Sequence, residues 1–116
     1  MPLSTAAFNL SLTSDLAIGQ PPVNYRIKTI VIDPGHGGRD NGTSGAYTIE
    51  KDIALKIARR LGANLKYNYP NTRVIYTRKE DRFIPLNERA RIANDNNADL
   101  FISIHCNSLP NSRINN

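Results

Sequence analysis

Short apolar runs alternate with amphipathic stretches from residue 27 onward. The runs Lys28–Asp33, Arg73–Thr77 and Leu100–His105 are rich in β-branched or other apolar side chains, and turn residues separate them from their surroundings, which predicts strands. Between them, Glu50–Leu65 and Pro85–Asn94 place apolar side chains at helical spacing, which predicts two helices. This alternation predicts an α/β fold with a parallel sheet and right-handed crossovers.

The first 25 residues have a different character, because they are rich in Ser, Thr, Ala, Asn and Pro and end near Pro21-Pro22. We interpret residues 1–25 as a leader or linker that is largely unstructured, and residues 26–116 as the folded part. The N-terminus lacks the basic region and continuous apolar core of a signal peptide. We also find no run approaching the roughly 18 apolar residues of a membrane span.

Length and charge limit the remaining possibilities. A chain of 116 residues forms one domain at most, and its single cysteine excludes an intrachain disulfide. The net charge of +5 suits an anionic partner such as nucleic acid, anionic lipid or an acidic wall polymer, although a solvated basic surface explains it equally well. Aromatic residues do not interleave with the basic ones at regular spacing, so we expect no nucleic-acid partner.

The two histidines of the chain each follow a predicted strand, and Glu50 begins the helix after the first one. Ligands of open parallel sheets gather at the carboxyl ends of the strands, so His36, His105 and Glu50 can converge there. Two imidazoles and one carboxylate form a donor set that zinc uses in hydrolytic sites. A metal ion in such a site supplies Lewis-acid chemistry for hydrolysis.

Plainer interpretations stand beside this one. Each histidine could be a hydrogen-bonding loop residue, and Glu50 could serve only the helix dipole. The glycine-rich loop after Asp33 could hold a phosphate, although it lacks P-loop and dinucleotide-binding spacings. Cys106 follows His105 on a predicted strand and so points to the other face, which favours a small buried apolar role.

Six blocks of residues, in order and at consistent spacing, resemble the zinc-dependent N-acetylmuramoyl-L-alanine amidases, the amidase-3 family of bacterial cell-wall hydrolases. The resemblance covers about residues 27–108. The blocks are Val31–Gly38, Asp40 with Gly42, Glu50–Leu55, Thr77-Arg78 with Asp81, Leu86 with Arg89, and Ala98–Asn107.

The resemblance implies that His36, Glu50 and His105 bind Zn²⁺, and that the substrate is the amide between N-acetylmuramic acid and the L-alanine of the peptidoglycan stem peptide. It further implies a parallel-sheet α/β sandwich of the phosphorylase/hydrolase-like type, incomplete in this chain, and a periplasmic or extracellular location at the cell wall.

Further residues of these blocks have less direct roles. We expect Asp33, Asp40 and Asn107 to form hydrogen bonds that orient the three ligands. Arg78, Asp81 and Arg89 also match the family pattern. For these three we expect a structural network between the loop and the second helix, rather than contact with substrate.

One departure from the family concerns proton transfer. The family carries another glutamate well after its second histidine, which acts as general base, whereas residues 106–116 contain no acidic side chain. We therefore expect that glutamate downstream of Asn116, no catalytic general base in this chain, and an impaired fragment of the catalytic domain. The alternatives are a non-catalytic, zinc-containing wall-binding or regulatory module, and self-association or complementation by the missing C-terminal segment.

Overall fold

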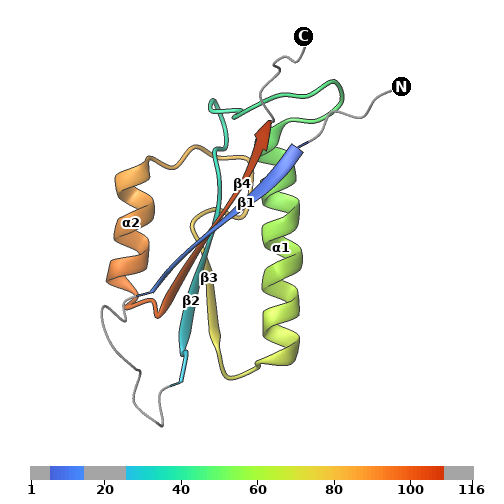
Figure 1. Ribbon diagram of the computed structural model, residues 1–116. Coiled ribbons are helices and arrows are strands. Elements are labelled where there is room, and N and C mark those ends of the chain that lie inside the picture. Colours follow the sequence, from blue (N-terminus) through green and yellow to red (C-terminus); the bar gives the residue numbers. More distant parts are fainter. Residues whose placement is uncertain (1–5, 15–25, 109–116) are drawn as a thin grey trace.

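A computed structural model describes residues 6–14 and 26–108 of the chain, and of residues 6–14, 107 and 108 it describes the backbone only. Within these ranges, four strands form one sheet and two helices pack beside it (Figure 1). The elements are β1 (Ala6–Ser14), β2 (Thr29–Pro34), α1 (Glu50–Asn68), β3 (Arg73–Tyr76), α2 (Leu86–Asp95) and β4 (Leu100–Ser108).

The strand order is β1-β4-β2-β3, and β2 lies at the centre of the three parallel strands. Figure 1 shows α1 on one side of this sheet and α2 on the other, as two right-handed crossovers in opposite directions require. The predicted α/β class and all five predicted elements are therefore confirmed. Their bounds differ from the predicted ones by a few residues at the element ends.

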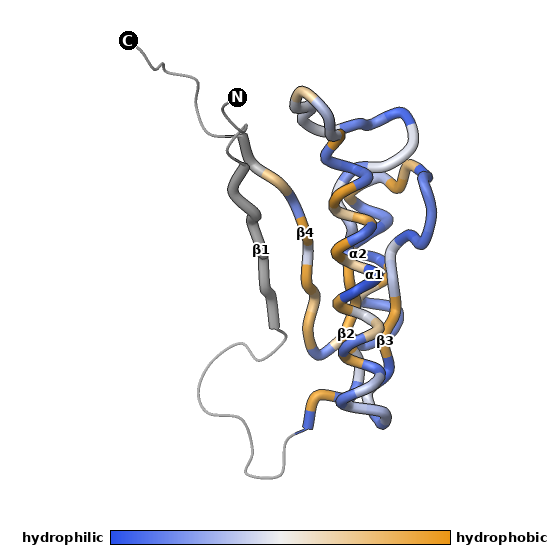
Figure 2. Tube along the Cα trace, turned by 90° about the vertical axis from the view of Figure 1, so that its right-hand side faces the viewer, coloured by the Kyte–Doolittle hydropathy of each residue, from blue (hydrophilic) through white to orange (hydrophobic). Residues whose placement is uncertain are grey.

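The apolar core lies between the sheet and α1. Alternate side chains of β2 and β4 point toward this helix, because successive residues of a strand face opposite sides of the sheet. Orange, apolar segments recur along β4 in Figure 2. The buried members of this core are Ile30, Ile32, Ala54, Ala58, Ile102 and Ile104.

Strand β1 corrects the prediction that residues 1–25 are largely unstructured. It pairs antiparallel with β4 from Ala6↔Ser108 to Ser14↔Leu100. The sequence from Phe8 to Thr13 alternates apolar and polar residues, a strand pattern that the polar composition of the surrounding segment hides. Without β1, the outer edge of β4 would carry unpaired backbone N–H and C=O groups, and β1 satisfies them. The other residues of that leader prediction, 1–5 and 15–25, lie outside the described part.

Both described helices are unsuited to crossing a bilayer, since neither offers a long enough apolar stretch.

Close packing of α1 on β3 generates a test of the fold. A Cβ atom on Gly62 would lie 2.6 Å from Cζ of Tyr76. Alanine ordinarily stabilises a helix interior by about 1 kcal/mol relative to glycine. Here the overlap forces the ring to move, so we expect Gly62→Ala to lower the free energy of unfolding by about 1–3 kcal/mol in urea denaturation. In a Tyr76→Val background, which lacks the ring, the same change should be stabilising, and a persistent loss there would contradict this account.

Candidate metal centre

Three side chains from distant parts of the chain meet at the carboxyl edge of the parallel sheet, the upper end in Figure 1. His36 follows β2, His105 lies near the end of β4, and Glu50 is the first residue of α1. Each offers one possible donor atom, and these atoms all lie within 4.8 Å of one another. The convergence predicted from the order of strands and helices is therefore present.

The two imidazoles both approach one carboxylate oxygen. Glu50 Oε2 lies 2.9 Å from His36 Nε2 and 3.3 Å from His105 Nδ1. The two rings stand edge to face with their centroids 5.1 Å apart. Four-coordinate zinc with bonds of about 2.0–2.2 Å needs its donors roughly 3–4 Å apart, and the two carboxylate–imidazole separations suit that ion.

Asp40 contacts the His36 ring, and its predicted role in orienting a metal ligand stays a prediction. Its carboxylate lies 2.9 Å from His36 Nδ1, so that the other ring nitrogen, Nε2, faces Glu50. The same contact lowers the pKa of Asp40, and the backbone N–H of Gly42 adds to that effect. A charged Asp40 in turn favours a proton on Nδ1 and fixes the tautomer.

Glu50 is buried, with 4% of its surface exposed, yet the pKa of its carboxyl is lowered. Burial alone raises the pKa of this carboxyl, but the backbone N–H groups of Thr43 and Cys106, the charge of His36 and the Thr43 hydroxyl together lower it. Oε1 accepts from the N–H and hydroxyl of Thr43, at 2.9 and 3.1 Å, and Oε2 accepts from the N–H of Cys106 at 3.0 Å. A buried anion held this way provides an anionic donor for a cation.

The glycines of the first loop allow the backbone to touch the three side chains. A Cβ on Gly42 would lie 2.6 Å from Glu50 Oε1 and 2.7 Å from His36 Cδ2. A Cβ on Gly35 would lie 2.6 Å from His105 Cε1. Gly35 and Gly42 therefore let the loop pack around the imidazoles and carboxylate, and neither needs a bound phosphate to explain it.

The other predicted orienting residues have different positions. Asp33 lies one layer deeper: its carboxylate accepts hydrogen bonds from Thr77 at 2.7 Å, Ser103 at 2.8 Å and Arg89 at 2.9 Å. The side chain of Asn107 lies outside what the structure describes. Cys106 is buried, as predicted, and its thiol pKa is raised by burial and by Glu50.

Sequence reasoning missed Thr43, which makes two hydrogen bonds to Glu50. It lies in an irregular loop where no periodic pattern marks a contact. The expected structural network of Arg78, Asp81 and Arg89 is present: both arginines are buried, and Asp81 bonds Gly38 N–H at 2.7 Å and Lys51 Nζ at 3.0 Å. These contacts pin the histidine loop to the segment before α2.

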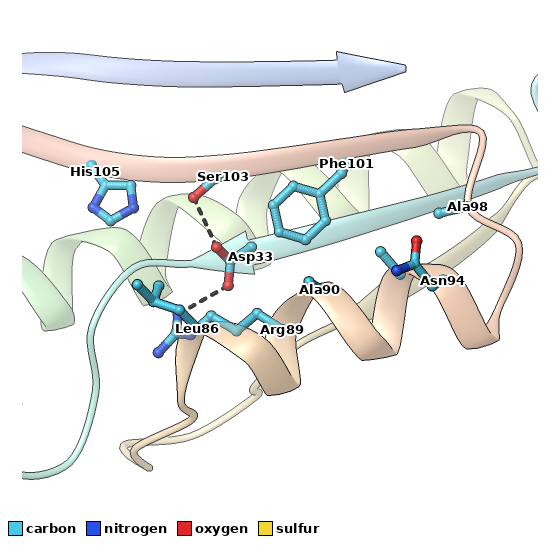
Figure 3. Close-up of a pocket in the computed structure, with 10 residues that line it drawn as sticks. Asp33, Leu86, Arg89, Ala90, Asn94, Ala98, Phe101, Ser103 and His105 are labelled. Carbon is cyan, nitrogen blue, oxygen red and sulfur yellow. Dashed lines mark hydrogen bonds and ion pairs between the residues drawn. The ribbon is translucent and has the colours of Figure 1, made fainter. Parts of the chain in front are cut away.

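A groove of about 460 Å³ opens beside His105, between β4 and α2 (Figure 3). Phe101 and Ala90 form its apolar walls, and the Asp33–Arg89 ion pair lies at its floor. Leu86 at its rim is 83% exposed. On this face the described part of the chain leaves apolar surface in contact with solvent, whereas α1 covers the opposite face.

Two imidazoles and an ionised carboxylate at the carboxyl edge of a parallel sheet define a class: α/β proteins with a donor set for a transition metal. Residues 30–115 match the family described as N-acetylmuramoyl-L-alanine amidase, and the chain belongs to that family. It is 50% identical to the N-acetylmuramoyl-L-alanine amidase AmiC of Escherichia coli O6:H1 over 80 residues, which are 68% of this chain and 19% of AmiC. It is 43% identical to the sporulation-specific N-acetylmuramoyl-L-alanine amidase of Bacillus subtilis, over 68% of this chain and 31% of that protein.

Solved amidase structures share the fold. The CwlD amidase of Clostridioides difficile, determined in complex with the GerS lipoprotein, superposes with a TM-score of 0.67 at 33% identity, over 74% of this chain and 51% of CwlD. The catalytic domain of CwlV from Bacillus (Paenibacillus) polymyxa var. colistinus superposes with a TM-score of 0.65 at 37% identity, over 68% of this chain and 45% of CwlV. The chain thus spans about half of these solved chains and less of its curated relatives.

Acid should destabilise the metal-free protein through its loop carboxylates. A hydrogen bond from the Lys51 side chain and, next in size, one from the Gly38 N–H lower the pKa of Asp81. The pKa values of Asp40 and Glu50 are lowered too. A carboxylate whose pKa is lower in the folded than in the unfolded state stabilises the fold at pH values above its unfolded-state pKa, near 4. This stabilisation is lost as the pH falls through the folded-state pKa.

We therefore expect the melting temperature of the metal-free chain to fall below about pH 4. The fall should be shallower for Asp81→Asn. Asp95→Asn, at the exposed end of α2, is the matched control and should leave the slope unchanged. Equal slopes for the Asp81 variant and the unmodified chain would contradict this account.

Proposed function

We propose that this chain carries the zinc-binding half of a peptidoglycan amidase, in which His36, Glu50 and His105 hold Zn²⁺. The single observation that carries the proposal is the convergence of these three donors within 4.8 Å in a chain of this family. The buried Glu50 carboxylate, whose pKa is lowered, supports the proposal. A buried anion next to two imidazoles would be stabilised by a bound cation.

The reaction that fits is hydrolysis of the amide between N-acetylmuramic acid and L-alanine, in the bacterial cell wall outside the cytoplasmic membrane. A bound zinc ion supplies Lewis-acid chemistry at the scissile carbonyl. The residues of this chain prepare the site: Asp40 fixes the tautomer of His36, Thr43 and the Cys106 N–H hold Glu50 ionised, and Gly35 and Gly42 let the backbone close around all three.

Proton transfer to the leaving amine needs a further group. We propose that this group is a glutamate encoded downstream of Asn116, and that the segment carrying it covers the groove beside His105. Support comes from the relatives, since the chain spans only 45–51% of two solved amidase chains, and from the exposed apolar walls of the groove. Self-association through the same groove is the competing way to cover it.

Zinc content provides the first test. The purified chain should bind one Zn²⁺ per molecule by elemental analysis, and a hundredfold excess of free zinc over its dissociation constant should stabilise it by about 2.7 kcal/mol. His36→Ala should lose both effects. Cys106→Ala is the matched control, because it removes a potential zinc-binding thiol next to His105 and should retain the metal. A chain that binds no zinc would refute the proposal.

Activity provides the second test. Proton transfer contributes about 10²–10⁴-fold to such reactions, so the chain alone should release stem peptides from purified sacculi slower than a full-length relative by a factor in that range. Adding a C-terminal amidase segment that contains the glutamate should restore the rate, and the same segment with that glutamate changed to glutamine should not. A rate comparable with the relative from the chain alone would show that no further glutamate is needed. If the chain binds sacculi but cleaves nothing, either alone or with the added C-terminal segment, the result would favour the non-catalytic module.

A further inference from the structure

The loop that carries His36 has an unusual backbone. His36, Gly37 and Gly38 have successive positive φ angles of 62°, 126° and 58°. Glycine adopts this region freely, but for a residue with a side chain the left-handed conformation costs about 1–2 kcal/mol. Such a conformation persists only where surrounding contacts over-determine it. The contacts that hold His36 in place are therefore part of what makes it available to a metal.

Two buried arginines supply those contacts. Arg89 donates through Nη1 to the Pro34 carbonyl and through Nη2 to the His36 carbonyl, both at 2.7 Å. Arg78 donates through Nε to the Pro34 carbonyl at 3.1 Å and through Nη2 to the Gly35 carbonyl at 2.7 Å. The guanidinium fork is planar and can hold several acceptors in fixed directions. The three successive carbonyls that end at His36 are thus all held by this arginine pair.

The arginine pair also reaches the segment that carries Glu50. Arg78 Nη2 donates to the carbonyl of Lys51, the residue after Glu50, at 3.0 Å. Its Nη1 donates to the carbonyl of Glu80, also at 3.0 Å. One guanidinium therefore spans the histidine loop, the first turn of α1 and the loop before α2.

The link to His105 passes through a carboxylate. Arg89 Nη1 lies 2.9 Å from Asp33 Oδ1, and the other oxygen of Asp33 accepts from Ser103 at 2.8 Å. Ser103 lies two residues before His105 on β4. Figure 3 shows this chain of contacts from Arg89 through Asp33 to Ser103, with His105 beside it. The arginine pair is therefore connected to the backbone of His36, to the residue after Glu50, and through Asp33 to a side chain two residues before His105.

The positive charge of Arg78 and Arg89 does not explain why these two side chains lie next to a proposed cation site. Arg89 pairs with the buried Asp33 carboxylate, whereas Arg78 donates to backbone carbonyls, and burial followed by the charge of Arg89 lowers the pKa of Arg78. Positive charge at this distance opposes the binding of a divalent cation. A favourable effect of the pair on metal binding must then come from geometry.

We propose that Arg78 and Arg89 are positioning residues for metal binding, which hold the carbonyls of Pro34, Gly35 and His36 so that the His36 imidazole stands ready opposite Glu50 and His105. This inference rests on the proposed function, because it concerns the same zinc site. It goes further by assigning the preorganisation of the site to two side chains outside the proposed ligand set.

The test measures metal affinity in the full 116-residue chain. Arg78→Lys and Arg89→Lys keep the charge but lose the fork, and each should weaken Zn²⁺ binding about 10–100-fold in a chelator competition. Arg78→Gln separates the two explanations: charge alone predicts tighter binding once the cation is removed, whereas positioning predicts weaker binding. The visible absorption of bound Co²⁺ should also change in all three variants, because the donor geometry changes.

The matched control is Arg60→Lys, since Arg60 is an exposed arginine in α1. It should leave affinity and spectrum unchanged. Melting of the metal-free variants shows whether each is folded. If an arginine variant fails to fold, Ser103→Ala keeps both arginines and the Asp33–Arg89 ion pair but removes the hydrogen bond that connects Asp33 to β4, and it should produce a smaller loss of affinity in the same direction.

The outcomes separate the two proposals. An unmodified chain that binds neither Zn²⁺ nor Co²⁺ would overturn the proposed function. A chain that binds metal, together with folded variants of unchanged affinity and cobalt spectrum, would leave the proposed function standing and overturn the positioning role. Lower melting temperatures with unchanged metal binding would show that the arginines are merely structural.

Discussion

The carboxylate of Asp33 is the interaction on which the rest of this structure depends. It is buried at the end of the central strand and binds one side chain from the loop after β3, one from α2 and one from β4. A buried carboxylate without partners would cost several kcal/mol, so the three contacts must form together. Their simultaneous formation fixes the carboxyl edge of the sheet, and the three proposed zinc ligands stand on that edge.

The fold was largely predictable because its signals are local. Apolar runs bounded by turns and stripes at helical spacing mark β2, α1, β3, α2 and β4 in the sequence. Strand β1 was not predicted, since its alternation is short, lies in a polar segment and becomes meaningful only when the edge of β4 is known. Pairing of strands that are about a hundred residues apart leaves no local trace.

The site was predictable in part for the same reason. His36, Glu50 and His105 could be placed at one edge, because topology alone brings the ends of β2 and β4 and the start of α1 together. Thr43 could not be found, and Asp33 was expected closer to the ligands than it lies. Hydrogen bonds between irregular loops depend on three-dimensional directions that residue spacing does not encode. That the three residues bind zinc stays a prediction.

Strand β1 has a consequence for any attempt to complete the sheet with added polypeptide. It lies outside residues 30–115, which match the family, and it pairs with β4 along its full length. A further strand that pairs with the same edge of β4 must therefore displace β1. Because β1 belongs to the same chain as β4, it is present at a high local concentration. Completion of the sheet would then proceed by strand exchange, with a rate limited by release of β1. Deleting residues 1–14 would convert that exchange into simple bimolecular addition.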